Sequence, residues 1–348
     1  MTAGLPPRPI RRVVLDPIFV PVALLLIVLF WSVAALAWLL GLLARRKRGR
    51  VWRLAALAGI YLSLDLVMLL GCFGLWLRSP WPAGHGPGKW RAAHVALLRW
   101  TLGRLMTASR KLLGFTVELE NPELRQQIWP AGQPEPPPVL VLARHAGPGD
   151  SFTLVHLIAS TLDRCPRVVL KAALQWDPGL DVLLNRLSCC FLPSATGAGE
   201  DRTGQLGELA ADLHSRDALL LFPEGGNWTP HRHRRAVRRL WRAGRTKAAR
   251  RAEADRHVLP PRPGGTLACL AARPDADVLV IAHTGLDTLV SPALMWRALP
   301  LSERPMTIGW WHVPGLAVPI DEAGRTEWLA QQWHRVDEWV AERGSMSR

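Results

Sequence analysis

An uncharged apolar run from Ile18 to Leu43 constrains this chain more than any other feature of the sequence. As a helix, its 26 residues extend about 39 Å, which exceeds the roughly 30 Å thickness of a bilayer core. The basic segment "LLGLLARRKRGR" follows the run, whereas a cleaved signal peptide has a shorter apolar core and a small-residue cleavage site. The run therefore predicts a membrane segment that is retained.

A second apolar run, Leu54 to Leu77, is interrupted only by Asp65. The link between the two runs is basic and so are both outer flanks. The positive-inside rule needs a difference in Lys and Arg content between the two sides, so it gives no orientation here. Two arrangements remain open: a hairpin that enters one leaflet and keeps all flanks on the cytoplasmic face, or two full spans. We favour the hairpin, and we expect the protein at the cell membrane.

The following segment, "SPWPAGHGPGKW", is dense in Pro and Gly and indicates a linker. Trp90 to Leu113 then mixes apolar and basic residues at helical spacing. This pattern fits an amphipathic helix on a lipid surface and equally a helix packed on the following domain. We expect a membrane-embedded helical hairpin over residues 1–80, a linker and interfacial helix over 81–114, and a further domain over 115–345.

From Phe115 onward, short β-type runs alternate with helical ones. The runs are "FTVELE", "PVLVLA", "RVVLKA", "ALLLFP", "DVLVIAH" and "MTIGWWHV". Strands alternating with helices predict an α/β domain with a mainly parallel sheet and flanking helices. Functional residues of such sheets gather where strands end, and His145 and Glu224 each follow one of these runs.

The stretch "ARHAGPGDSF", Ala143 to Phe152, carries the clearest chemical pattern. Glycine and proline between His145 and Asp150 allow a turn tight enough for the carboxylate to reach one imidazole nitrogen. Imidazole exchanges protons near neutral pH, and a carboxylate partner fixes its tautomer. The pattern predicts a general base and its orienting group. The alternative is that Asp150 only caps the helix that follows.

Other stretches extend this pattern in an ordered series. They are "VLKAALQWDP" (Val169 to Pro178), "FPEGG" (Phe222 to Gly226), "HVLPPRPGG" (His257 to Gly265) and "EWLAQQWHRVDEW" (Glu327 to Trp339). With them the chain resembles the PlsC-type glycerolipid acyltransferase family, whose signatures are NHxxxxD and FPEGT. It is most similar to the branch of lysocardiolipin and lysophosphatidylinositol acyltransferases. The resemblance extends from about Val139 to Trp339.

The resemblance implies that His145 is the general base and Asp150 its orienting residue, with Glu224, Gly225 and Gly226 in the acceptor site. It implies transfer of a fatty acyl group from acyl-CoA or acyl carrier protein to the free hydroxyl of a lysophospholipid. The acceptor is either 1-acylglycerol-3-phosphate or a diester lysophospholipid. No cofactor is implied, because the acyl donor is itself a substrate.

Three positions depart from the family pattern. Arg144 stands where the family has Asn, Gly226 where it has Thr, and Ser194 where it has a phosphate-binding Arg. Lys171 and Arg202 are the candidate cations for a substrate phosphate in its place.

The departures leave an alternative of another class, a membrane lipid-binding relative that has lost catalysis. The joint presence of His145, Asp150 and Glu224 favours an enzyme.

The net charge of +15 and the basic stretch His231 to Arg256 indicate an anionic partner. Because the chain also has predicted membrane segments, anionic lipid headgroups or the phosphates of CoA are simpler partners than nucleic acid. No nucleic-acid-binding module accompanies the stretch. We therefore expect the catalytic domain on the cytoplasmic face and no nucleic acid. His231 and His233 lack the spacing of a metal site, and the five cysteines form no CxxC.

Overall fold

The computed structural model describes residues 5–43, 49–78, 87–123, 126, 128, 136–147, 149–192, 202–287, 289, 291–302 and 305–346. The chain divides into two compact units. The first consists of Met1–Thr116, Val169–Ala198 and Trp296–Glu303, and the second of Val117–Val168, Gly199–Met295 and Arg304–Arg348. Residues 169–198 thus belong to the same compact unit as the N-terminal helices. The division into a membrane hairpin, a linker with an interfacial helix and a further domain, with boundaries at residues 80 and 114, stays a prediction.

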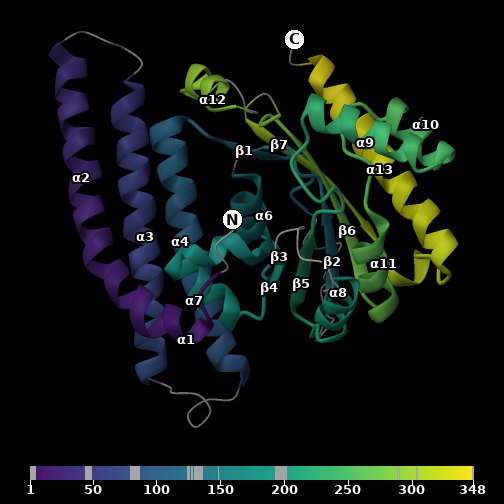
Figure 1. Ribbon diagram of the computed structural model, residues 1–348, viewed down its shortest axis with the longest axis horizontal. Helices are drawn as coiled ribbons and strands as arrows, with labels where there is room; N and C mark the ends of the chain where they lie inside the picture. Colours follow the sequence, from purple (N-terminus) through teal and green to yellow (C-terminus); the bar gives the residue numbers. More distant parts are fainter. Residues whose placement is uncertain are drawn as a thin grey trace. The chain divides into compact units, whose positions relative to one another are not determined.

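Two long apolar helices dominate the first unit. They are α2 (Asp16–Leu43) and α3 (Arg50–Arg78), which lie side by side (Figure 1). The short turns α1 (Arg8–Ile10) and η1 (Arg11–Leu15) precede them. Both long helices have the length and composition needed to cross a membrane, so the two apolar runs form the helices that the sequence predicts.

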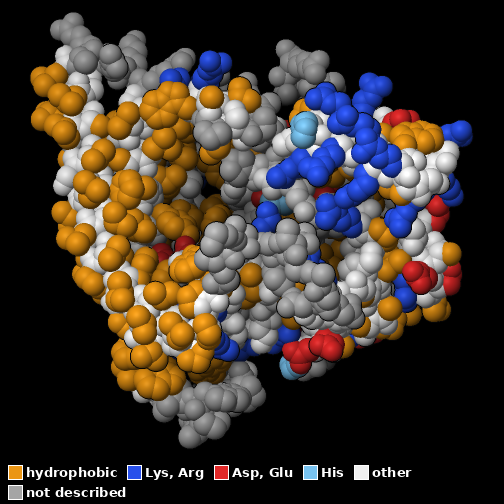
Figure 2. Space-filling model, in the orientation of Figure 1, with side chains coloured by type: hydrophobic (Ala, Val, Ile, Leu, Met, Phe, Trp, Pro, Cys, Tyr) orange, Lys and Arg blue, Asp and Glu red, His pale blue; other side chains and the backbone are white. Residues whose placement is uncertain are grey.

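The two helices differ in burial. Only 6% of the apolar stretch of α2 is buried, against 39% in α3. Leu25 and Val28 of α2 are 72% and 66% exposed, and apolar side chains cover the visible face of this helix pair (Figure 2). By contrast α3 buries Asp65 and Leu66 among its neighbours. A bare apolar surface in water is unfavourable, so α2 presents the face that most needs a lipid environment.

The amphipathic segment forms α4 (Pro87–Leu113), which packs along α3 and contacts α7 (Pro178–Arg186). Leu98 and Leu102 are buried on its inner side. Arg186 of α7 donates to the carbonyl of Cys72 in α3 (2.6 Å) and to His94 Nε2 in α4 (2.9 Å). Helices of its own unit therefore cover the apolar side of α4. A role of this helix at the lipid surface stays a prediction.

The first unit also contains η2 (Ala172–Trp176) and β4 (Cys190–Leu192). Its most buried acidic group outside the long helices is Asp181 of α7, which is 1% exposed. Its carboxylate accepts from Arg11 Nε (3.0 Å) and pairs with Arg12 Nη1 (2.9 Å). The chain that leads into α2 is thereby tied to α7.

The second unit is built on a mainly parallel sheet. Its strands are β1 (Val117–Leu119), β2 (Val139–Ala143), β3 (Cys165–Lys171), β5 (Asp217–Leu221), β6 (Asp277–Thr284) and β7 (Met306–Val313). The last residues of β3, from Val169 onward, belong to the first unit. The strand order is β1-β7-β6-β2-β5-β3-β4. Every pairing is parallel except that of β6 with β7. The predicted α/β class is confirmed, and β4 is a strand that the sequence did not indicate.

Helices fill the connections of this unit. They are α6 (Asp150–Ser160), α8 (Arg202–Ala211), α9 (Pro230–Arg242), α10 (Thr246–Ala254), α11 (Pro263–Ala272), α12 (Pro292–Ala298), η3 (Gly315–Ala317) and α13 (Glu322–Met346). The end of α12, from Trp296 onward, belongs to the first unit. Every residue of β2 and β5 is buried, as expected for central parallel strands. The basic stretch forms two helices, α9 and α10. The break between them contains Gly244, whose φ is +69°.

Candidate active site

Strand register brings three titratable side chains together from distant parts of the sequence. Leu142 of β2 pairs with Leu221 of β5 and with Val280 of β6. Continuing the same register by three residues aligns His145 with Glu224 and with His283. All three therefore lie at the carboxyl ends of adjacent parallel strands, where binding sites of α/β sheets form.

The turn after β2 depends on two glycines. A Cβ on Gly147 would lie 2.4 Å from Leu286 Cβ, so no side chain fits there. Gly149 has φ +86°, in the left-handed region that glycine enters without strain. The turn delivers Asp150 as the first residue of α6, one position after the N-cap Gly149.

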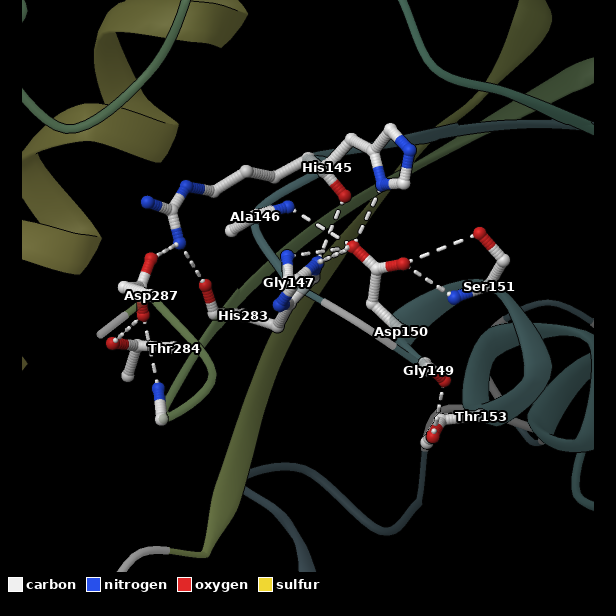
Figure 3. Close-up of polar contacts among 12 residues, drawn as sticks. His145, Ala146, Gly147, Gly149, Asp150, Ser151, Thr153, His283, Thr284 and Asp287 are labelled. Carbon is white, nitrogen blue, oxygen red and sulfur yellow. Dashed lines mark hydrogen bonds and ion pairs between the residues drawn. The ribbon is translucent and has the colours of Figure 1, made fainter. Parts of the chain in front are cut away.

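The close-up in Figure 3 shows the Nδ1 side of the His145 ring turned toward Asp150. Nδ1 lies 2.8 Å from Asp150 Oδ2, and the same oxygen accepts the N–H groups of Ala146 (3.0 Å) and Gly147 (3.2 Å). An ionised carboxylate can only accept, so Nδ1 carries the proton and Nε2 keeps a lone pair. Within the described residues nothing hydrogen-bonds to this Nε2, and the His145 side chain is 20% exposed. The ring can therefore take a proton from a substrate.

The interpretation of Asp150 as only a helix cap is wrong, because its Oδ2 is committed to the turn and to His145. Its other oxygen, Oδ1, accepts the N–H (2.6 Å) and the hydroxyl (3.2 Å) of Ser151. Burial raises the pKa of Asp150, but the hydrogen bonds that its carboxylate accepts from His145 and from the Gly147 N–H hold that pKa below its ordinary value. The carboxylate is therefore ionised at neutral pH and stabilises positive charge on the ring.

His283 lies behind this pair and is completely buried. Its Nε2 is 2.8 Å from the carbonyl oxygen of Arg144 and 3.7 Å from Asp150 Oδ2. Burial lowers the pKa of His283, so the ring is neutral and donates its Nε2 proton to the carbonyl. It packs against Asp150 without bringing a competing charge.

Arg144, which departs from the family pattern, has a structural role in this chain. Its side chain is 1% exposed and donates to the carbonyl oxygens of His257 (2.6 and 3.0 Å) and His283 (2.6 Å). It also forms an ion pair with Asp287, which accepts from Thr284 Oγ1 (2.8 Å). The guanidinium thus ties the end of β2 to two other segments of the unit.

Glu224 is 1% exposed. Burial raises the pKa of Glu224 to about 8, although Arg144, the N–H groups of Leu259 and His145 and the Trp333 indole oppose this effect. At neutral pH the side chain is therefore protonated. A neutral, buried carboxyl is placed to support the turn that contains it, and its predicted contact with the acceptor stays a prediction.

The other predicted site residues lie on several different elements. Gly225 is exposed and Gly226 is half-buried, in the turn beside Glu224. Arg202 is the first residue of α8 in the second unit, and Lys171 is exposed at the end of β3 in the first unit. Ser194 lies outside the described residues.

Comparison with protein families gives one match. The family model described as Acyltransferase matches residues 117–262, which contain His145, Asp150 and Glu224. No curated protein and no solved structure matches the chain. This part of the chain is therefore similar to acyltransferases, and acyl transfer in general is the chemistry that the match supports.

The sequence did not indicate His283 or the Arg144–Asp287 pair as parts of the site. A histidine at the end of the apolar run "DVLVIAH" was the available signal. Its meaning depends on the pairing of β6 with β2, 138 residues away in register, and nothing local to either strand specifies that pairing.

Proposed function

We propose that this protein transfers a fatty acyl group from acyl-CoA or acyl carrier protein to the free hydroxyl of a lysophospholipid. The supporting observation is the His145–Asp150 pair, with its 2.8 Å contact and open Nε2, inside the part of the chain that matches acyltransferases. The resemblance of several stretches to the lysocardiolipin and lysophosphatidylinositol branch supports a diester lysophospholipid as acceptor. 1-Acylglycerol-3-phosphate is the other acceptor under test.

The proposed chemistry needs no nucleophile from the protein. His145 Nε2 removes the proton of the acceptor hydroxyl as its oxygen attacks the thioester carbonyl. Asp150 stabilises the imidazolium that forms. The tetrahedral intermediate then expels the thiolate, which takes the proton from His145 Nε2 and leaves as a thiol. An ester bond forms, a thioester bond breaks, and the histidine returns to its starting state.

We further propose that the protein acts at the cell membrane, with its catalytic part on the cytoplasmic face. The exposed apolar side of α2 supports membrane attachment. Exposed arginines on α9 fit an anionic surface. The lengths of α2 and α3 satisfy both a re-entrant hairpin and two full spans.

The activity test uses the full chain purified in a neutral detergent. Thioester consumption and the acylated product are measured with lysophosphatidate, lysophosphatidylglycerol and lysophosphatidylinositol, for the wild type and for His145→Ala. We expect one of these acceptors to be acylated by the wild type, and turnover to fall about 10²–10⁴-fold in the variant. Acceptor binding without turnover in the wild type would instead identify an inactive lipid-binding protein.

The attachment test uses Leu25→Arg with Val28→Arg, two exposed positions of α2, against the apolar control Leu25→Val with Val28→Leu. Each charge near a membrane centre costs about 2.5–3.5 kcal/mol on insertion scales. We expect the double arginine variant, and not the control, to leave vesicles in sedimentation assays. Release of the wild-type protein by high salt alone would show that these helices are not inserted.

A further inference from the structure

Arg262 lies directly on the turn that follows β5. Its backbone N–H donates to the carbonyl of Pro223 (2.8 Å). A Cβ on Gly225 would lie 3.2 Å from Cδ, Nε and Cζ of Arg262, so the side chain covers this exposed glycine. Arg262 is itself exposed and immediately precedes α11. The turn beside Glu224 therefore has the guanidinium of an exposed arginine next to it.

Helix α9 brings further arginines to the same turn. Arg232 Nη1 donates to the carbonyl of Asn227 (3.1 Å) and lies 3.5 Å from the Cβ position of Gly226. Arg239 is two helical turns further along α9, on the same edge as Arg232. Burial and then the positive charge of Arg239 lower the pKa of Arg262, which agrees with the position of Arg239 on this edge of the helix.

Within the described residues, no carboxylate forms an ion pair with Arg232, Arg239 or Arg262. Basic side chains of α10 differ, because Lys247 and Arg251 both pair with Glu327. Glu224 adds no negative charge to the turn, since its pKa of about 8 keeps it protonated at neutral pH. Basic side chains also dominate the visible surface over α9 (Figure 2).

We propose that Arg262, Arg239 and Arg232 bind a phosphate group of a substrate beside the Gly225–Gly226 turn. Converging guanidinium groups with no carboxylate partner favour a phosphate, which accepts several charge-assisted hydrogen bonds at once. The turn follows β5 directly, next to the strand that delivers His145, so a substrate held there is close to the base. The proposal rests on the proposed function. It assigns the cation site that the sequence left to Lys171 or Arg202.

The phosphate has two possible sources, the acceptor lipid or the acyl donor, and steady-state kinetics separates them. Arg262→Ala and Arg239→Ala are compared with Arg234→Ala, an exposed arginine on another side of α9 with the same change in charge. We expect the KM for one substrate to rise about tenfold or more in the first two variants, with kcat nearly unchanged. A rise for the lysophospholipid that the wild type acylates assigns the acceptor phosphate, and a rise for acyl-CoA assigns the donor phosphates.

Unchanged KM values for both substrates in Arg262→Ala and Arg239→Ala would overturn the proposal. So would equal effects in Arg234→Ala, because they would mark a general basic surface for anionic membranes. Assays in neutral detergent micelles and in anionic vesicles reveal that case, since a surface effect disappears in the micelles.

Equilibrium binding separates this proposal from the proposed function. CoA and lysophosphatidate are titrated into the His145→Ala protein, with and without Arg262→Ala, in neutral micelles. Binding that depends on Arg262 in a protein whose wild type turns over no acceptor would support the phosphate site and refute the proposed activity. Normal turnover together with binding that is unchanged by Arg262→Ala would support the proposed activity and refute the phosphate site.

Discussion

Asp150 and Asp181 are both buried aspartates, but their carboxylates have different hydrogen-bond partners. Each is 1% exposed, and each lies in the first turn of a short helix, Asp150 in α6 of the second unit and Asp181 in α7 of the first. Both carboxylates accept several hydrogen bonds. The partners of Asp181 include Arg11, at 3.0 and 3.3 Å, and Arg12, whereas Asp150 accepts a hydrogen bond from the imidazole of His145.

The two carboxylates differ in whether their partner can exchange a proton. The arginines on Asp181 stay charged and have no acceptor sites, and Gln175 (3.1 Å) and Asn185 (2.8 Å) occupy its remaining lone pairs. That cluster is closed and structural. The imidazole on Asp150 has a second nitrogen that is open and can exchange a proton. Whether the hydrogen-bond partner of a buried carboxylate can transfer a proton therefore depends on which residue that partner is.

The largest expected effect comes from removing the charge of Asp150. In Asp150→Asn the side chain keeps its size and an oxygen acceptor, but it no longer stabilises the imidazolium or holds the Nδ1 tautomer. We expect kcat to fall about 10²–10⁴-fold with little change in membrane attachment. Initial rates with purified protein and vesicle sedimentation measure the two properties. A variant with wild-type kcat would remove Asp150 from the mechanism.

Asp181→Asn tests the closed cluster. The change leaves the buried Arg11 guanidinium without its counter-charge, and breaking a buried ion pair typically costs about 3–5 kcal/mol. We expect the thermal unfolding temperature of the detergent-solubilised protein to fall clearly, while kcat per folded molecule is retained. Loss of kcat without loss of stability would show that Asp181 also serves the reaction.

Glu224 is a third buried carboxyl, and it has no ion pair within the described residues. The folded protein holds a proton there up to pH about 8, whereas an ordinary glutamic acid with a pKa of 4.5 releases it. Between these values the folded state binds more protons than the unfolded state, so stability falls as the pH rises, by up to about 1.4 kcal/mol per pH unit. Above pH about 8 this contribution is constant.

Glu224→Gln removes that titration. We expect its unfolding temperature, relative to the wild type, to rise steadily from pH 5 to pH 8, as measured by intrinsic tryptophan fluorescence in one detergent. Parallel profiles for the two proteins would mean that Glu224 is ionised in the folded state. The buried group would then require a cationic partner.

The smallest effect is expected from Ser151→Ala. Its hydroxyl donates to Asp150 Oδ1 at 3.2 Å, but the Ser151 N–H donates to the same oxygen. Loss of the hydroxyl contact costs about 1 kcal/mol, so we expect less than a tenfold change in kcat. A loss as large as that of Asp150→Asn would show that the hydroxyl, and not the backbone, orients the carboxylate.

Local patterns were enough to predict the two apolar helices, the α/β class and the His145–Asp150 pair. A five-residue spacing with glycines specifies its own turn, and alternating runs specify strands and helices. The scaffold around the pair could not be predicted in this way. Arg144 bonds to carbonyl groups 113 and 139 residues away in the sequence, and Arg262 meets Gly225 only because α11 begins beside the turn after β5. Such contacts depend on strand order and register, which no short segment encodes.

Because α2 and α3 are buried to different extents, we expect the two helices to tolerate substitutions differently. The outward positions of α2 need only be apolar, so Leu25 and Val28 are free to drift among hydrophobic residues. In α3, a Cβ on Gly59 would lie 3.2 Å from Trp31 and a Cβ on Gly71 would lie 3.0 Å from Leu97. An unrelated hydrophobic helix could therefore be grafted in place of much of α2, whereas α3 must keep its small residues to remain in its bundle.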